Sequence, residues 1–160
     1  MGALIAYQLT RRLRRQEDLL PTWLGMSAYC APRGEAGADG CPHLMSDDEL
    51  RRWLRSVGGS PPQLLGNDAV WHKFAPAFRS DFTLVDTWAP PRNPEPLPVP
   101  LSVFGGRRDK LIGEDRLLSW RAFTTHFRGL ERYEGNHFYL MNHQQHLAVA
   151  ITAAMRSAAP

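Results

Sequence analysis

The chain has 160 residues, which is enough for one domain with a substantial hydrophobic core. Hydrophobic residues make up 43% and charged residues 22% of it, a balance typical of soluble globular proteins. The net charge is +3 with the arginines spread along the chain, which argues against a nucleic-acid binder, and no apolar run is long enough to span a membrane.

The first 15 residues are predicted to form an amphipathic helix. They lack the basic region that precedes the apolar core of a signal peptide, so we expect a cytoplasmic protein. A buried strand over residues 22–28 follows, and helix and strand together form half of a parallel β/α unit. The apolar face of the helix is predicted from helical spacing to consist of Met1, Leu4, Ile5, Leu9 and Leu13.

The middle of the chain is predicted to be helical. Residues 29–45 form a loop that holds both cysteines, Cys30 and Cys41, in neither a CxxC pair nor a zinc-binding spacing. A capping box, Ser46-Asp47-Asp48-Glu49, then begins a helix that Gly58-Gly59 ends. A short turn and a longer helix to about Trp88 follow, so residues 46–88 are a block of helices inserted between two strands.

The last part of the chain alternates strands and helices. A proline-rich connector over residues 89–98 leads to a core strand at 99–104, and the remaining elements are a helix at 113–123, a strand at 127–133 and a helix at 142–156. The whole order is helix, strand, helical insertion, strand, helix, strand, helix. This order predicts an α/β fold that corresponds to the second half of a doubly wound parallel sheet.

An acid and a histidine follow two neighbouring strands. Asp109 comes after the strand at 99–104 and the glycine turn Gly105-Gly106, and His137 comes after the strand at 127–133 and Glu134-Gly135-Asn136. Open α/β sheets place their chemistry at the carboxyl ends of their strands, so we expect the two side chains to lie at one edge. Taken alone, each is equally well explained as an ordinary turn residue.

Five motifs, in order, resemble those of the type II thioesterases of nonribosomal peptide and polyketide synthesis, which have the α/β-hydrolase fold. The first motif resembles the residues after the nucleophile in the family's Gly-His-Ser-Met-Gly-Ala elbow, and the last resembles its Gly-Asp-His-Phe-Phe-Leu histidine turn. The second and third resemble the beginning and end of its helical lid, and the fourth its acid turn. The five are Met1-Gly2-Ala3-Leu4-Ile5-Ala6, Cys41-Pro42-His43-Leu44 with Ser46-Asp47-Asp48-Glu49-Leu50, Ser80-Asp81-Phe82 with Thr87-Trp88, Gly105-Gly106-Arg107-Arg108-Asp109, and Gly135-Asn136-His137-Phe138-Tyr139-Leu140.

This resemblance covers nearly the whole chain and implies one partial α/β-hydrolase domain over residues 1–160, with about three strands and a helical lid at about 46–88. It implies that His137 accepts the proton of a serine nucleophile and that Asp109 orients the imidazole. The family's serine would stand directly before Met1, so we expect the chain to be truncated just after it. The backbone N–H of Met1 would complete the oxyanion hole.

The activity that the resemblance implies is hydrolysis of acyl thioesters. The substrate would be carried on the phosphopantetheine arm of an acyl or peptidyl carrier protein, with no metal, no organic cofactor, no nucleic acid and no membrane involved, and the complete protein would be a monomer. The alternative is a non-catalytic remnant, or a carrier-binding fragment without hydrolase activity.

Other candidate residues carry less weight. Ser27 half-matches a nucleophile elbow, but the large Tyr29 stands where the tight elbow needs a small residue, and Cys30 is weaker still. His43 is better explained as a structural loop residue, and His143 with His146 has no third ligand for a metal nearby. The lid aromatics Trp53, Trp71, Phe74 and Phe78 either form the lid's own core or line an acyl channel.

Overall fold

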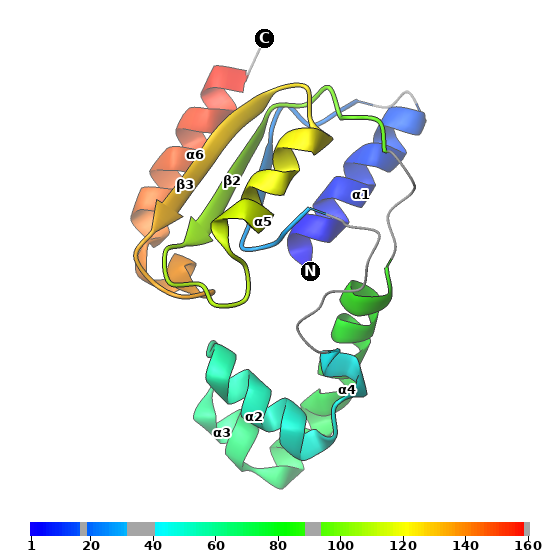
Figure 1. Cartoon of the computed structure of the whole chain (residues 1–160), viewed down its shortest axis with the longest axis vertical. Coiled ribbons are helices and arrows are strands. Elements are labelled where there is room, and N and C mark those ends of the chain that lie inside the picture. Colours follow the sequence, from blue (N-terminus) through cyan, green and yellow to red (C-terminus); the bar gives the residue numbers. More distant parts are fainter. Residues whose placement is uncertain (17–18, 32–40, 89–93, 159–160) are drawn as a thin grey trace. The chain divides into compact units, whose positions relative to one another are not determined.

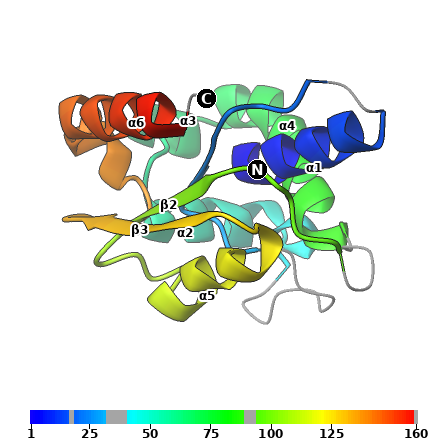
Figure 2. The ribbon, with the colours of Figure 1, turned by 90° about the horizontal axis from the view of Figure 1, so that it is seen from above.

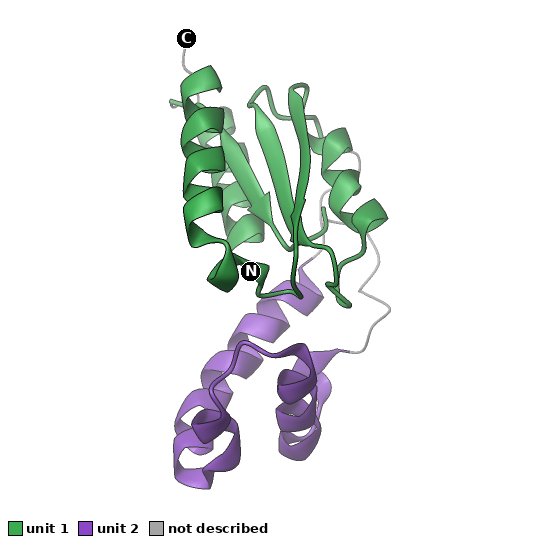
Figure 3. Cartoon of the chain, turned by 90° about the vertical axis from the view of Figure 1, so that its left-hand side faces the viewer, with its two compact units in different colours: residues 1–32, 92–160 green, residues 33–91 purple. Residues whose placement is uncertain are grey.

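The computed structural model describes residues 1–16, 19–31, 41–88 and 94–158. It divides into two compact units, one made of residues 1–32 and 92–160 and the other of residues 33–91 (Figure 3). Parts of the predicted loop at 29–45 and of the proline-rich connector at 89–98 lie outside the described residues. Each unit has its own hydrophobic core and is described by itself below.

The first unit is built on a three-stranded parallel sheet, which confirms the predicted α/β class. The strands are β1 (Leu24–Ser27), β2 (Leu101–Gly106) and β3 (Phe127–Tyr133), in the order β1-β2-β3 (Figure 1). Met26 pairs with Val103, and Val103 pairs with Leu130. The three strands therefore end at the same edge of the sheet.

Helices cover both faces of this sheet. They are α1 (Gly2–Arg15), α5 (Glu114–Leu118) and α6 (Gln144–Ala158), with 3₁₀ turns at Ser119–Phe123 and Tyr139–Asn142. Helices α5 and α6 lie on opposite sides of β2 and β3 (Figure 2). On the α5 side, Tyr7 of α1 contacts Trp120 and Phe123 edge to face, with ring centroids 5.3 and 5.6 Å apart. On the α6 side, Leu147 and Ile151 pack near Phe104 and Tyr139.

The predicted apolar face of α1 is partly wrong. Leu4 is buried as expected, but the other buried residues of the helix are Tyr7 and Thr10, while Ile5 and Leu9 are 49% and 54% exposed. Helical spacing fits both faces of this sequence. The face with Leu4 and Tyr7 is the buried one, because the Tyr7 ring packs edge to face against Trp120. A large aromatic ring stabilises the core when it is buried, although tyrosine also carries a polar hydroxyl.

Two further expectations need correction. The helix predicted at 113–123 ends at Leu118 and continues as a 3₁₀ turn, in which the Trp120 indole N–H reaches the carbonyl of Tyr29 at 2.7 Å. Burial of this indole requires a partner for its N–H, so tertiary contact sets the local backbone. In α6, Met155 is 50% exposed, although it belongs to the predicted apolar stripe.

The second unit consists of helices, as predicted for this stretch. These are a 3₁₀ turn η1 (Pro42–Leu44) and the helices α2 (Asp47–Val57), α3 (Pro62–Gly66) and α4 (Asp68–Thr87). The capping box is present, because the Ser46 hydroxyl accepts from the Glu49 amide and the Glu49 carboxylate accepts from the Ser46 amide. The core of the unit is formed by Leu50, Leu54, Leu65, Trp71 and Ala75.

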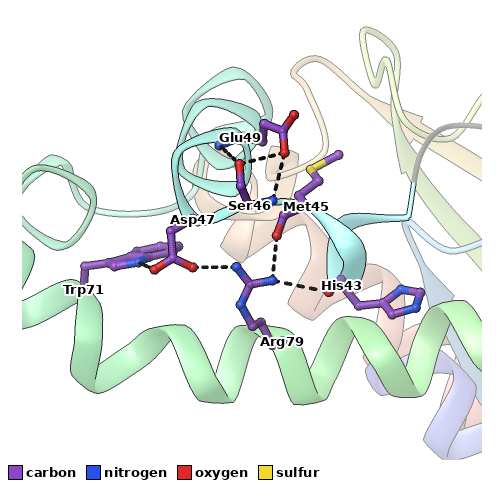
Figure 4. A network of polar contacts seen from close by, with 7 residues as sticks. All are labelled: His43, Met45, Ser46, Asp47, Glu49, Trp71 and Arg79. Carbon is purple, nitrogen blue, oxygen red and sulfur yellow. Dashed lines mark hydrogen bonds and ion pairs between the residues drawn. The ribbon is translucent and has the colours of Figure 1, made fainter.

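A polar network ties the beginning of this unit to α4 (Figure 4). The Arg79 guanidinium donates to the carbonyls of His43 (3.3 Å) and Met45 (2.7 Å) and pairs with Asp47. Asp47 also accepts from the indole N–H of Trp71 at 2.9 Å. The hydrogen bonds from Arg79 and Trp71 hold the pKa of Asp47 below its usual value.

Within the described residues, no helix combines the length and the apolar character that a membrane crossing requires. In the same part of the chain, β1 pairs with β2 alone.

Candidate functional site

The structure brings Asp109 and His137 together at the carboxyl edge of the sheet. The Asp109 Oδ2 atom lies 2.9 Å from the His137 Nδ1 atom. The side chain of Asp109 is fully buried, whereas that of His137 is 26% exposed. An ionised carboxylate can only accept hydrogen bonds, so Nδ1 carries the proton and Nε2 keeps the basic lone pair. A histidine held in this way can take a proton at Nε2 while the carboxylate stabilises the resulting charge.

Backbone amides hold Asp109 on its other side. Its Oδ1 atom accepts from the amides of Leu111 (2.8 Å) and Ile112 (3.2 Å), which closes the turn that follows β2. Both carboxylate oxygens therefore have partners. These hydrogen bonds hold the carboxylate in a single orientation without any contribution from a substrate.

The histidine turn packs directly against the end of β2. The Arg107 amide donates to the Tyr133 carbonyl (2.8 Å), and the Arg108 amide donates to the Gly135 carbonyl (2.9 Å). Gly135 has a φ of +129°, which favours glycine. Asn136 stabilises the turn because its Oδ1 atom accepts from the Phe138 amide at 2.9 Å.

Asp109 should make the first unit sensitive to acid. Burial alone would raise its pKa, but the hydrogen bonds from His137, Leu111 and Ile112 outweigh burial and leave the pKa below its ordinary value. A depressed pKa contributes stability above the ordinary value of about 4, and that stability is lost as the pH falls through the folded-state pKa. We expect the free energy of unfolding to decrease below about pH 4 and the Asp109→Asn variant to show a flatter acid limb.

Urea unfolding at a series of pH values measures this slope. Asp115→Asn is the control, because it removes one carboxylate from an exposed position in α5 of the same unit. Equal acid slopes in the wild type and in Asp109→Asn would contradict the assignment of the depressed pKa to Asp109.

Arg132 also supports the acid turn, and sequence reasoning did not identify it. From β3, its guanidinium donates to the carbonyls of Arg107 (2.8 Å) and Gly106 (3.3 Å) and forms an ion pair with Glu114. It thereby caps carbonyl groups at the place where the chain leaves β2. An arginine at an alternating strand position gives no signal of this role in the sequence.

The remaining sequence candidates lie in other settings. Ser27 is exposed at the end of β1, and its hydroxyl lies 2.8 Å from that of Tyr139. His43 belongs to the second unit, where its Nδ1 atom contacts Asp86 at 2.7 Å. Met1 is the N-cap of α1, which begins at the end of the first unit where β2 and β3 finish (Figures 1 and 3).

Among the described residues, no group of three or more histidine, cysteine, aspartate or glutamate side chains could hold a metal ion. His143 instead contacts the Glu134 carbonyl through Nε2 at 2.7 Å. The two cysteines are not joined in a disulfide.

Comparisons with known proteins identify the family. Residues 1–155 match the family model described as "Thioesterase domain". The gramicidin S biosynthesis protein GrsT of Aneurinibacillus migulanus is 31% identical over 140 residues, which cover 88% of this chain and 54% of GrsT. The thioesterase PikA5 of Streptomyces venezuelae is 29% identical over 146 residues, covering 91% of this chain and 50% of PikA5.

Solved structures agree. The type II thioesterase BorB from the borrelidin biosynthetic cluster has 29% identity and a TM-score of 0.81, with 96% of this chain and 61% of BorB covered. The type II thioesterase YbtT from the yersiniabactin pathway has 25% identity and a TM-score of 0.87, with 98% and 63% covered. The chain thus spans between half and two thirds of the length of these relatives. The chain belongs to the thioesterase domain family. It has the α/β-hydrolase fold, and within this family it is a relative of the type II thioesterases of nonribosomal peptide and polyketide synthesis.

Proposed function

We propose that this chain supplies the acid and the base of an acyl-thioester hydrolase, with Asp109 and His137 as two members of a Ser-Asp-His triad. The observation that carries the proposal is the buried Asp109 carboxylate on Nδ1 of His137, which leaves Nε2 as the basic nitrogen. By the resemblance, the serine would stand directly before Met1, and the Met1 backbone N–H would contribute to the oxyanion hole.

In the proposed reaction, Nε2 of His137 accepts the serine proton as the hydroxyl attacks the thioester carbonyl. The imidazolium then protonates the departing thiolate, and an acyl-serine remains. In the second half, His137 takes a proton from water, the hydroxide attacks the acyl-serine, and the acid leaves as the serine regains its proton. The acyl group is carried on the phosphopantetheine thiol of a carrier protein. By the resemblance, the helices at 46–88 serve as the lid of the family.

The experiment compares two polypeptides: the product of the gene with all its in-frame upstream codons, and the 160-residue chain itself. Each is assayed for hydrolysis of an acyl-phosphopantetheinyl carrier protein and for binding of that carrier. We expect turnover by the longer product when its upstream codons place a serine directly before Met1, and no turnover by the 160-residue chain, which begins at Met1. Carrier binding without turnover by either product favours the alternative, a non-catalytic carrier-binding fragment. Neither binding nor turnover would contradict both readings.

A further inference from the structure

The hydroxyl of Tyr139 links the histidine turn to a strand two positions away in the sheet. Tyr139 is the first residue of the 3₁₀ turn after His137, and its side chain is 1% exposed. Its Oη atom lies 2.8 Å from Oγ of Ser27, the last residue of β1. Because β2 lies between β1 and β3, this bond joins the segment that follows β3 to a strand that does not pair with β3.

The ring of Tyr139 is fixed as firmly as its hydroxyl. It stacks on Tyr133 with ring centroids 5.6 Å apart and planes 13° from parallel. It also belongs to the buried cluster with Ala28, which directly follows β1, and Phe104 of β2. A ring packed in a buried cluster has little freedom, so the surrounding protein and not the solvent sets the position of its hydroxyl.

The backbone around Tyr139 transmits this position to His137. The Tyr139 amide donates to the Asn136 carbonyl at 3.1 Å. The Cα and Cβ atoms of Tyr139 lie 3.2 Å from the point that a Cβ on Gly135 would occupy. Tyr139 therefore touches the turn on the far side of His137 as well as following it in the chain. A displacement of Tyr139 must move the segment that carries the imidazole.

The hydroxyl is a feature of this chain that the family resemblance does not imply. The family motif that this turn resembles is Gly-Asp-His-Phe-Phe-Leu, with phenylalanine at the place of Tyr139. Burial raises the pKa of Tyr139, so its hydroxyl stays protonated at neutral pH and remains able to donate. A buried hydroxyl without a partner would destabilise the fold, and Ser27 provides that partner.

We propose that Tyr139 is a positioning residue for His137: the bond between its hydroxyl and Ser27 holds the histidine turn so that the imidazole stays aligned with Asp109. The consequence for catalysis rests on the proposed function. The effect on the His137–Asp109 hydrogen bond does not, because it can be measured without turnover.

The test measures how fast the Nδ1 proton of His137 exchanges with water, by NMR of the chain. Tyr139→Phe removes only the hydroxyl and Ser27→Ala removes only its partner. Each variant should speed the exchange about five-fold. This factor corresponds to the loss of one hydrogen bond with a net free energy of about 1 kcal/mol, since 1.4 kcal/mol corresponds to a factor of ten. The double variant should exchange no faster than either single variant, because both remove the same bond.

Tyr133→Phe is the matched control. It removes the hydroxyl of the stacked neighbour, which donates to Glu131 on β3 and not to β1. This variant should leave the exchange of the His137 proton unchanged. If Tyr139→Phe lowers the unfolding midpoint but leaves the exchange unchanged, the hydroxyl only stabilises the core and the proposal is wrong.

Two further outcomes keep the test decisive. If Tyr139→Phe does not fold, Ser27→Ala still decides, because it changes an exposed residue at the end of β1 and leaves the buried ring of Tyr139 in place. Unchanged exchange in a folded Ser27→Ala variant would overturn the proposal. Faster exchange in both variants, together with no thioester turnover by any product of the gene, would uphold the positioning role and contradict the proposed function.

Discussion

Gly106→Ala should destabilise the first unit by about 2–3 kcal/mol, the cost of forcing an extra carbon into a closed contact. A Cβ at this position would lie 2.2 Å from the carbonyl oxygen of Asn136 and 2.7 Å from that of Gly135. Both are backbone atoms of the histidine turn, which cannot rotate away as a side chain could. The turn would have to move off the end of β2, and His137 would move away from Asp109.

Two other glycines give a graded control, measured by urea unfolding. Gly105→Ala places its Cβ 2.4 Å from Cδ1 of Leu117, a side-chain end that can shift, so its cost should be smaller. Gly113→Ala meets no atom within 4 Å and has a φ of −70°, so it should cost less than about 1 kcal/mol. Equal urea midpoints for Gly106→Ala and Gly113→Ala would show that Gly106, at the end of β2, is not in close contact with the histidine turn at Gly135 and Asn136.

His137→Ala and Asp109→Asn should each lower kcat/KM for an acyl thioester by roughly 10³- to 10⁴-fold in the form of the protein that turns it over. In the proposed mechanism, the first change removes the base. The second leaves a side chain whose amide can donate to Nδ1, which favours the tautomer with the proton on Nε2 and removes the lone pair that the reaction needs. The double variant should be little worse than either single one, because the two residues act as a unit.

His126→Ala is the matched control for the removal of a histidine. His126 is exposed, directly precedes β3 and therefore lies at the opposite edge of the sheet from His137. Its variant should keep wild-type kcat/KM. Turnover that survives in a folded His137→Ala variant would place the chemistry elsewhere in the chain.

Much of the fold was predictable from local patterns. The strand predicted at 127–133 is β3, and the helix predicted over residues 1–15 is α1 with its first residue as cap. The capping box at Ser46 begins α2 as expected. The strand predicted at 99–104 is shifted to Leu101–Gly106, because the glycines that were expected to end it still pair with Arg132 and Tyr133 of β3. Glycine leaves a strand easily, but it need not do so at once.

The sequence also predicted part of the candidate site, namely the edge of the sheet at which its acid and its histidine lie. Asp109 and His137 could be placed at one edge from strand order alone, since parallel strands end together. The sequence could not reveal that the carboxylate would meet Nδ1 at 2.9 Å, or that Gly106 is required by the close approach of the histidine turn. Both depend on how far each turn extends beyond the sheet, which is set by contacts between segments about 30 residues apart.

The sequence by itself determined the order of the elements, the parallel three-stranded sheet and the family, because periodicity, glycine turns and motif order are properties of neighbouring residues. Tertiary structure alone decided which face of α1 is buried, where the helix after Glu114 turns into a 3₁₀ segment, and which side chains fix the histidine turn. Tyr7, Arg132 and Tyr139 owe their roles to partners far away in the chain. Such contacts are selected by the packing of a whole core, in which the fit of one ring or hydroxyl outweighs its local pattern.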